Sequence, residues 1–144
     1  MKENMTSAEK ELASLLQVLQ TKLSPLKTES EPARDYVLLL TDESFGHGNE
    51  ALGKILMKFF LKTLTTSTIK PKVLILMNDG VHLACENSPV LGSLSILVEQ
   101  GVKVLVDGTS VDYYQAEKKI KAGQVVSMFA ICCDLLSAGR VIGL

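Results

Sequence analysis

Hydrophobic positions recur at helical spacing over residues 6–23, near the beginning of the sequence. One stripe of this expected helix holds six apolar side chains: Ala8, Leu12, Leu15, Leu16, Leu19 and Leu23. Apolar residues three and four positions apart are typical of an amphipathic helix. The Ser24-Pro25 pair ends the pattern, and the polar, turn-rich segment 27–34 follows it. We therefore expect residues 1–33 to form a helix and a linker.

From about Arg34 onward, short apolar runs alternate with helical patterns. Continuous apolar runs predict strands at 36–40, 73–77, 102–106 and 140–142. Helical spacing predicts helices at 52–64, 88–100, 112–121 and 128–136. Strands that are apolar throughout and alternate with helices indicate a parallel sheet covered on both faces. We expect residues 34–144 to form one α/β domain, a three-layer α/β/α arrangement with a mainly parallel sheet of four to five strands.

Polar segments follow each of the first three predicted strands. In open α/β sheets, ligands bind beyond the carboxyl ends of the strands, so these segments predict a pocket. After the first strand the candidate pocket residues are Gly46, His47 and Gly48. After the second strand they are Asn78, Asp79, Gly80 and His82. After the third strand they are Asp107, Gly108, Thr109 and Ser110.

Two common kinds of site find little support in these segments. Glycines before a helix can bring backbone N–H groups to a phosphate, but the GxGxxG pattern fails at Ala51 and no GxxxxGK[ST] occurs. A flexible turn is therefore the favoured interpretation of 46–48. Four side chains, those of His47, His82, Cys85 and Asp107, are possible metal ligands, yet their spacing matches no metal motif. We predict neither a metal nor a cofactor.

The three cysteines differ in their expected roles. Cys85 lies just before the Ser88-Pro89 helix start, and a thiol near a helix N-terminus has a lowered pKa and is nucleophilic. Cys85 is thus the candidate catalytic residue, with a partly buried, inert side chain as the alternative. Cys132 and Cys133 lie on an almost wholly apolar helix, so we expect them in the core.

Composition narrows the classes of function. The 144 residues carry a net charge of -1 and no basic patch, which argues against a nucleic-acid partner. No apolar run approaches the roughly 20 residues of a membrane span, and the first residues lack a signal-peptide pattern. We therefore expect a cytoplasmic protein without a membrane partner. An odd number of cysteines without a CxxC argues against a disulfide framework or a zinc ribbon.

Several segments in one order resemble the DsrE-like sulfur-relay family, and within it the C-terminal domain of YedF-type selenium-metabolism proteins. These segments are 46–61 (GHGNEALGKILMKFFL), 77–83 (MNDGVHL), 99–105 (EQGVKVL), 108–114 (GTSVDYY) and 123–129 (GQVVSMF). The resemblance covers about residues 34–144. It implies the DsrE-like fold, a pocket at the sheet edge and a homo-oligomer, which in relatives is often a trimer or hexamer.

The chain departs from the family where the family carries its reactive cysteines. The Cys-Gly-Thr-Cys of the family corresponds here to Asp107-Gly108-Thr109-Ser110. Persulfide relay requires a thiolate that attacks and then holds sulfur, and neither an aspartate nor a serine supplies one. YedF-type proteins also usually carry an N-terminal TusA-like domain, and residues 1–33 stand in its place.

Three hypotheses on function follow from these residues. In the first, the chain is a DsrE-like protein without the usual persulfide cysteines, and it binds a small ligand or a sulfur- or selenium-pathway partner rather than acting as an enzyme. In the second, it is an active sulfurtransferase or sulfur carrier that uses Cys85. In the third, it is a structural interaction protein assembled through helix 6–23. The alternative interpretation is that helix 6–23 packs back on its own domain.

Overall fold

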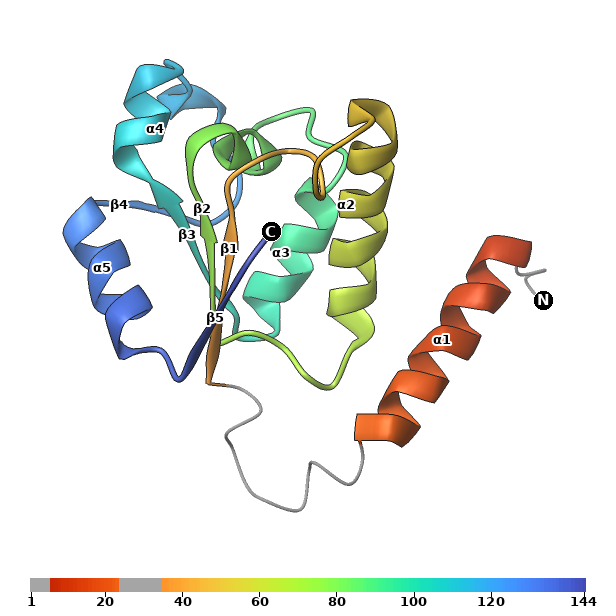
Figure 1. The fold of residues 1–144 in the computed structure, drawn as a ribbon. Helices are drawn as coiled ribbons and strands as arrows, with labels where there is room; N and C mark the ends of the chain where they lie inside the picture. Colours follow the sequence, from red (N-terminus) through yellow and green to blue (C-terminus); the bar gives the residue numbers. More distant parts are fainter. Residues whose placement is uncertain (1–5, 24–34) are drawn as a thin grey trace.

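The computed structural model describes residues 6–23 and 35–144, with the side chains of 20–23 left out. The expected linker at 27–34 lies outside the described residues. Figure 1 shows the chain running through helices and strands in alternation. In order, the elements are α1 (Ser7–Leu23), β1 (Tyr36–Leu40), α2 (Glu50–Thr66), β2 (Val73–Leu76), the 3-10 helix η3 (Asn78–Ala84), α3 (Leu91–Glu99), β3 (Lys103–Asp107), α4 (Gly108–Tyr113), the 3-10 helix η4 (Glu117–Lys119), β4 (Gln124–Val126), α5 (Met128–Ser137) and β5 (Arg140–Gly143).

Within the described residues, five parallel strands form one sheet in the order β4-β3-β2-β1-β5. Val37 pairs with Val73, and Leu74 pairs with Val104, so the three central strands lie in register over their apolar runs. Helices α2 and α3 cover one face of this sheet, and α5 covers the other (Figure 1). The predicted three-layer α/β/α fold with a parallel sheet is confirmed.

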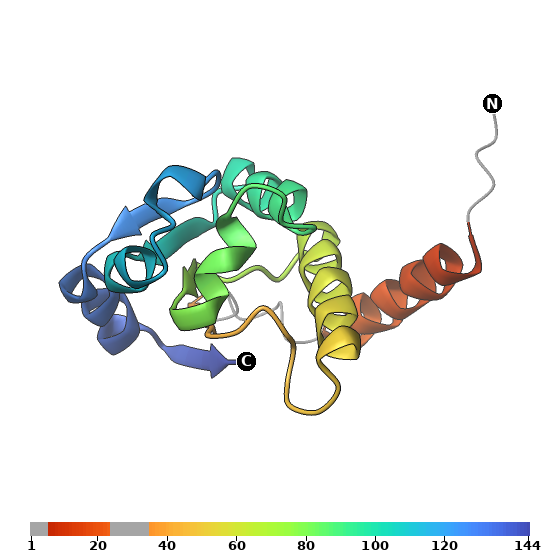
Figure 2. The same ribbon diagram turned by 90° about the horizontal axis from the view of Figure 1, so that it is seen from above.

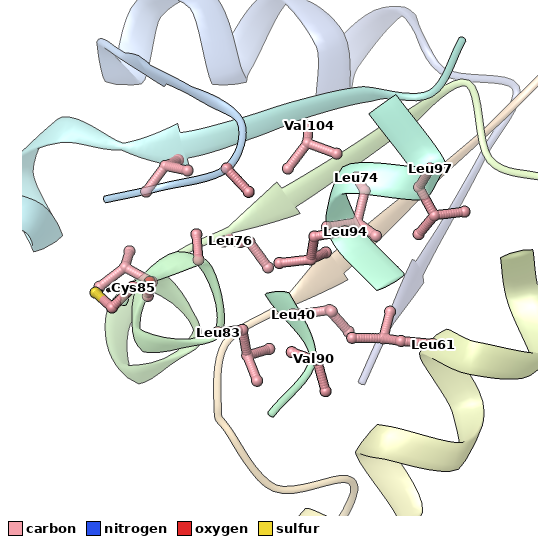
Figure 3. Close-up of a cluster of buried hydrophobic side chains, with 14 of the residues drawn as sticks. Leu40, Leu61, Leu74, Leu76, Leu83, Cys85, Val90, Leu94, Leu97 and Val104 are labelled. Carbon is pink, nitrogen blue, oxygen red and sulfur yellow. Dashed lines mark hydrogen bonds between the residues drawn. The ribbon is translucent and has the colours of Figure 1, made fainter. Parts of the chain in front are cut away.

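Alternate residues of each strand supply the two halves of the core. Between the sheet and α2 and α3 lies a large cluster that includes Leu38, Leu40, Met57, Leu61, Leu74, Leu76, Leu94, Leu97 and Val104 (Figure 3). Between the sheet and α5 lies a smaller cluster of Val37, Val73, Ile75, Leu105 and Ile131. Because both sides of each central strand are buried, the strands read as continuous apolar runs.

Two predicted helix boundaries need correction. The helix expected at 112–121 is instead α4, which begins at Gly108, followed by η4 at 117–119. The reason is that the Asp107 side chain accepts a hydrogen bond from the Ser110 N–H and caps a helix that begins four residues earlier than expected. The helix expected from Ser88 begins at Leu91, after a turn in which Ser88 Oγ accepts from the Val90 N–H. The edge strand β4 was not predicted.

The expectation that Cys132 and Cys133 lie in the core is wrong. Both are exposed, because α5 turns mainly Ile131 toward the sheet and leaves the other side of the helix in solvent. An apolar sequence therefore marks a buried helix only when other elements cover all of its faces.

The N-terminal helix forms as expected, and its first turn is closed by a reciprocal cap. The Thr6 N–H donates to Glu9 Oε2 at 2.9 Å, and the Glu9 N–H donates to Thr6 Oγ1 at 3.3 Å. The apolar stripe of α1 is only partly covered: Leu15 is 61% and Leu19 48% exposed, while Leu12 and Leu16 are half-buried. Of the helices described, α1 included, none has the length and apolar character to cross a membrane.

Candidate functional site

Three segments meet at the carboxyl edge of the sheet: the β1–α2 connection, η3 and α4. They come together because β1, β2 and β3 are parallel neighbours that end at the same edge, which Figure 2 shows from above. A cavity of about 450 Å³ opens there. It is lined by Leu39, Thr41, Asp42, Ser44, Gly46, His47, Asn78, Asp79, Gly143 and Leu144. Of the predicted pocket residues, four thus line this cavity.

The β1–α2 connection adopts backbone conformations that glycine permits. Gly46 has φ of 77° and Gly48 has φ of 133°, both in the left-handed region that side chains disfavour. Asn49 then caps α2, its Oδ1 accepting the Leu52 N–H at 2.9 Å. The Ser44 N–H donates to Asp42 Oδ1 at 3.0 Å, which holds the first half of the loop. This geometry places His47 on the cavity wall.

The segment after β2 is a 3-10 helix, η3, rather than an open loop. Its Gly80 lies against the end of β1, where an added Cβ would be 2.2 Å from the Leu40 carbonyl oxygen. Asn78 starts η3 with φ of 53°, a conformation that asparagine tolerates better than most residues. The close approach brings Asn78 and Asp79 to the cavity.

Asp107 and Ser110 form a structural link between α4 and η3. The Ser110 hydroxyl donates to Asp107 Oδ2 at 2.6 Å and accepts the Asn78 N–H at 2.8 Å. Asp107 is only 2% exposed, and its Oδ1 atom has no hydrogen-bond partner among the described residues. Neither residue lines the cavity; they support its wall by holding Asn78. Gly108 and Thr109, which lie between Asp107 and Ser110, belong to the first turn of α4.

Tyr114 is a site residue that the sequence did not single out. Its hydroxyl donates to Asp79 Oδ1 at 2.5 Å and lies 3.1 Å from Asn78 Oδ1. The hydrogen bond to Asp79, with smaller contributions from desolvation and nearby negative charge, raises the pKa of Tyr114 to about 12. The His82 ring packs edge-on against Tyr114 at 4.5 Å between centroids, and His82 Nδ1 lies 3.0 Å from the Asp79 carbonyl oxygen. Tyr114 thereby fixes the orientation of the Asp79 carboxylate.

The charged side chains at the cavity are mainly acidic. Asp42 and Asp79 line it, and no lysine or arginine is among the described lining residues. A negatively charged wall attracts cations and repels phosphate or sulfate. The cavity therefore offers carboxylate, hydroxyl and amide groups to a positively charged or hydroxyl-rich ligand, and the phosphate interpretation of 46–48 loses support.

Cys85 lies away from this cavity, at the edge of the large core cluster (Figure 3). It is buried at the C-terminal end of η3, and its thiol donates to the Val81 carbonyl oxygen at 3.6 Å. Burial raises the pKa of the Cys85 thiol above its usual value, only partly offset by the charge of Lys119. A nucleophilic thiol needs the opposite shift. The geometry disfavours Cys85 as a catalytic residue.

The donors proposed for a metal do not gather in space. Among residues 6–23 and 35–144, no group of three or more histidine, cysteine, aspartate or glutamate side chains has an arrangement that could hold a metal ion. His47 lines the cavity, whereas His82 packs on Tyr114 and Asp107 caps α4.

Comparison with known proteins gives a match at the level of structure. No protein-family model and no curated protein matches the sequence. Among solved structures, the crystal structure of the YchN protein from E. coli is similar, with a TM-score of 0.55 at 16% sequence identity. The match covers 76% of this chain and 98% of YchN. YchN has the DsrE-like fold, and this chain therefore has the same fold.

Proposed function

We propose that this chain is a cytoplasmic member of the DsrE-like family that binds a small polar ligand at the carboxyl edge of its sheet and carries no sulfur at the end of β3. One observation carries the proposal. At the family's cysteine positions, the Asp107 carboxylate caps a helix and the Ser110 hydroxyl both donates and accepts a hydrogen bond. These groups are occupied in holding the fold, while the cavity beside them is open.

The proposed relatives are the sulfur- and selenium-relay proteins. The segment 46–61, which resembles the YedF-type domain, forms part of the cavity wall and most of α2. We infer that the chain keeps the pocket and the homo-oligomeric assembly of these proteins, as a trimer or hexamer. A partner from a sulfur or selenium pathway would then meet a binding protein, not a persulfide carrier.

The cavity suits a ligand with a positive charge or several hydroxyl groups. Its volume of about 450 Å³ lies within the range of small-molecule sites. Asp42 and Asp79 supply carboxylates, Thr41 and Ser44 supply hydroxyls, and Leu39 supplies an apolar side. A carboxylate pair with adjacent hydroxyls can receive the N–H groups of an amine or the O–H groups of a polyol.

The proposal is tested by isothermal titration calorimetry with three probes: putrescine, glucose and inorganic phosphate. We expect heat of binding from the amine or the sugar and none from phosphate. The variant pair Asp42→Asn and Asp79→Asn should remove binding. Asp112→Asn, an exposed aspartate outside the lining, is the matched control and should bind as the wild type does. Binding of phosphate, or undiminished amine or sugar binding by both variants, would overturn the proposal.

A further inference from the structure

Helix α2 carries an exposed apolar surface on the side away from the core. Four residues, which we call the α2 outer face, are between 43% and 53% exposed: Leu52, Ile55, Leu56 and Phe59. Their spacing places them along one side of the helix, and the buried Met57 and Leu61 lie on the opposite side. An apolar stripe of this length on a surface helix usually marks a contact with another element.

Helix α1 carries a second unpartnered stripe of matching length. Four of its leucines, which we call the α1 stripe, are Leu12, Leu15, Leu16 and Leu19. None of them belongs to either buried core cluster; Leu15 and Leu19 are 61% and 48% exposed, and Leu12 and Leu16 are half-buried. Both helices have 17 residues, so each is about 25 Å long. The two stripes can therefore cover one another along their whole length.

Charges beside the two stripes favour one relative direction. Glu9 and Glu11 flank the α1 stripe at its N-terminal end, while Lys10 points to the opposite side of the helix at 100° per residue. Lys58 and Lys62 lie beside the α2 outer face in the C-terminal half of α2. An antiparallel pairing places these acids next to these lysines, whereas a parallel pairing separates them.

We propose that the α1 stripe of one copy docks antiparallel on the α2 outer face of a second copy of this chain. This inference rests on the proposed homo-oligomer and names the surfaces that hold it together. The protein's own α1 does not take this position in the structure. Figure 1 shows it running in roughly the same direction as α2, not antiparallel to it.

Exchange between two copies also accounts for all of the exposed stripes. Each copy gives its α1 to the other copy and receives the other copy's α1 on its own α2. Reciprocal docking of this kind buries both stripes in each copy at once.

The experiment measures the mass of the full chain by sedimentation at several concentrations, with a helical CD melt to confirm folding. We expect the wild type to sediment as a multiple of the 15.6 kDa chain. Both Leu15→Glu with Leu19→Glu, and Leu56→Glu with Phe59→Glu, should sediment as single chains. Phe129→Glu, which changes an apolar residue 79% exposed on α5, is the matched control and should keep the wild-type mass.

Mixing the two double variants tests the exchange itself. Each variant keeps the surface that the other lacks, so the mixture should regain a mass above one chain. A pairing of α1 with α1, or of α2 with α2, would leave one of the two variants oligomeric by itself and would overturn the inference. Lys58→Glu with Lys62→Glu should raise the dissociation constant roughly tenfold, and adding Glu11→Lys should lower it again.

The outcomes also separate this inference from the proposed homo-oligomer. A wild type that is a single chain at every concentration contradicts both. A wild-type oligomer that survives the α1 and α2 substitutions contradicts only the docking of α1 on α2.

Discussion

Ser110 shows how a position that carries chemistry in one protein can carry structure in another. Its hydroxyl joins the capping carboxylate of Asp107 to the backbone of Asn78, and so connects the ends of β3 and β2. A thiol at this position would form weaker hydrogen bonds to both partners. The aspartate and the serine therefore act as a pair: one caps the helix, and the other links the cap to the cavity wall.

This link predicts the effect of removing one hydroxyl. Ser110→Ala leaves the Asn78 N–H without its acceptor and Asp107 with one donor fewer, so the free energy of unfolding should fall by about 1–2 kcal/mol. Urea denaturation measures the change. Ser95→Ala is the control, because Ser95 donates only to the Leu91 carbonyl on an exposed helix face and should change stability by less than about 0.5 kcal/mol. Equal effects of both substitutions would contradict a linking role for Ser110.

The three thiols should react in an order set by burial. Cys132 and Cys133 are exposed, whereas Cys85 is buried and its pKa is raised by burial. Iodoacetamide at neutral pH should therefore label Cys132 and Cys133 first, as read by mass spectrometry of the digested protein. Because a raised pKa means that the thiolate forms only at higher pH, labelling of Cys85 should increase only as the pH rises above the usual thiol range. Rapid labelling of Cys85 at neutral pH would instead revive the sulfur-carrier hypothesis.

At the scale of elements, the sequence predicts what local pattern determines and misses what contacts determine. The strands β1, β2 and β3 were predicted to within a residue or two because each is apolar on both sides. The strand β4 has only three residues at a sheet edge, so it leaves no pattern to detect. Tyr114 follows α4, and only the fold brings its hydroxyl to Asp79, 35 residues away. The cavity could be located from the polar loops, but its supports could not.

The position of η3 depends on one glycine, which predicts a matched pair of substitutions. In Gly80→Ala the new Cβ would lie 2.2 Å from the Leu40 carbonyl oxygen, so η3 must move away from β1. We expect a loss of about 2 kcal/mol or more, together with a changed cavity wall. In Gly92→Ala the new Cβ meets nothing within 4 Å inside α3, so helix propensity should raise stability by about 0.5–1 kcal/mol. Thermal unfolding of both variants measures the difference, and equal melting temperatures would contradict this role of Gly80.

At the scale of the whole molecule, the two faces of the sheet are covered unequally. Two helices, α2 and α3, and the larger core cluster protect one face, while α5 and a cluster of five buried residues protect the other. Exposed apolar side chains lie on the outer sides of the covering helices α2, α3 and α5, and also on α1. When a single helix covers a face of the sheet, the stability of that layer depends strongly on each side chain that the helix buries. On the face covered by α5, that side chain is Ile131.

Ile131→Ala should therefore destabilise the protein far more than an apolar truncation of the same size on the same helix. Ile131 is fully buried between α5 and the sheet, so the substitution opens a cavity and should cost about 2–5 kcal/mol. Leu136→Ala removes the same number of carbon atoms from a side chain that is 87% exposed, and it should cost less than about 0.5 kcal/mol. Chemical denaturation of the two variants compares the costs directly. Hydrogen exchange adds a second readout: protection should fall first along α5 and β3 in Ile131→Ala, because those elements share this contact. A similar loss for both variants would mean that α5 is covered on its outer side in solution, by a second copy or another partner.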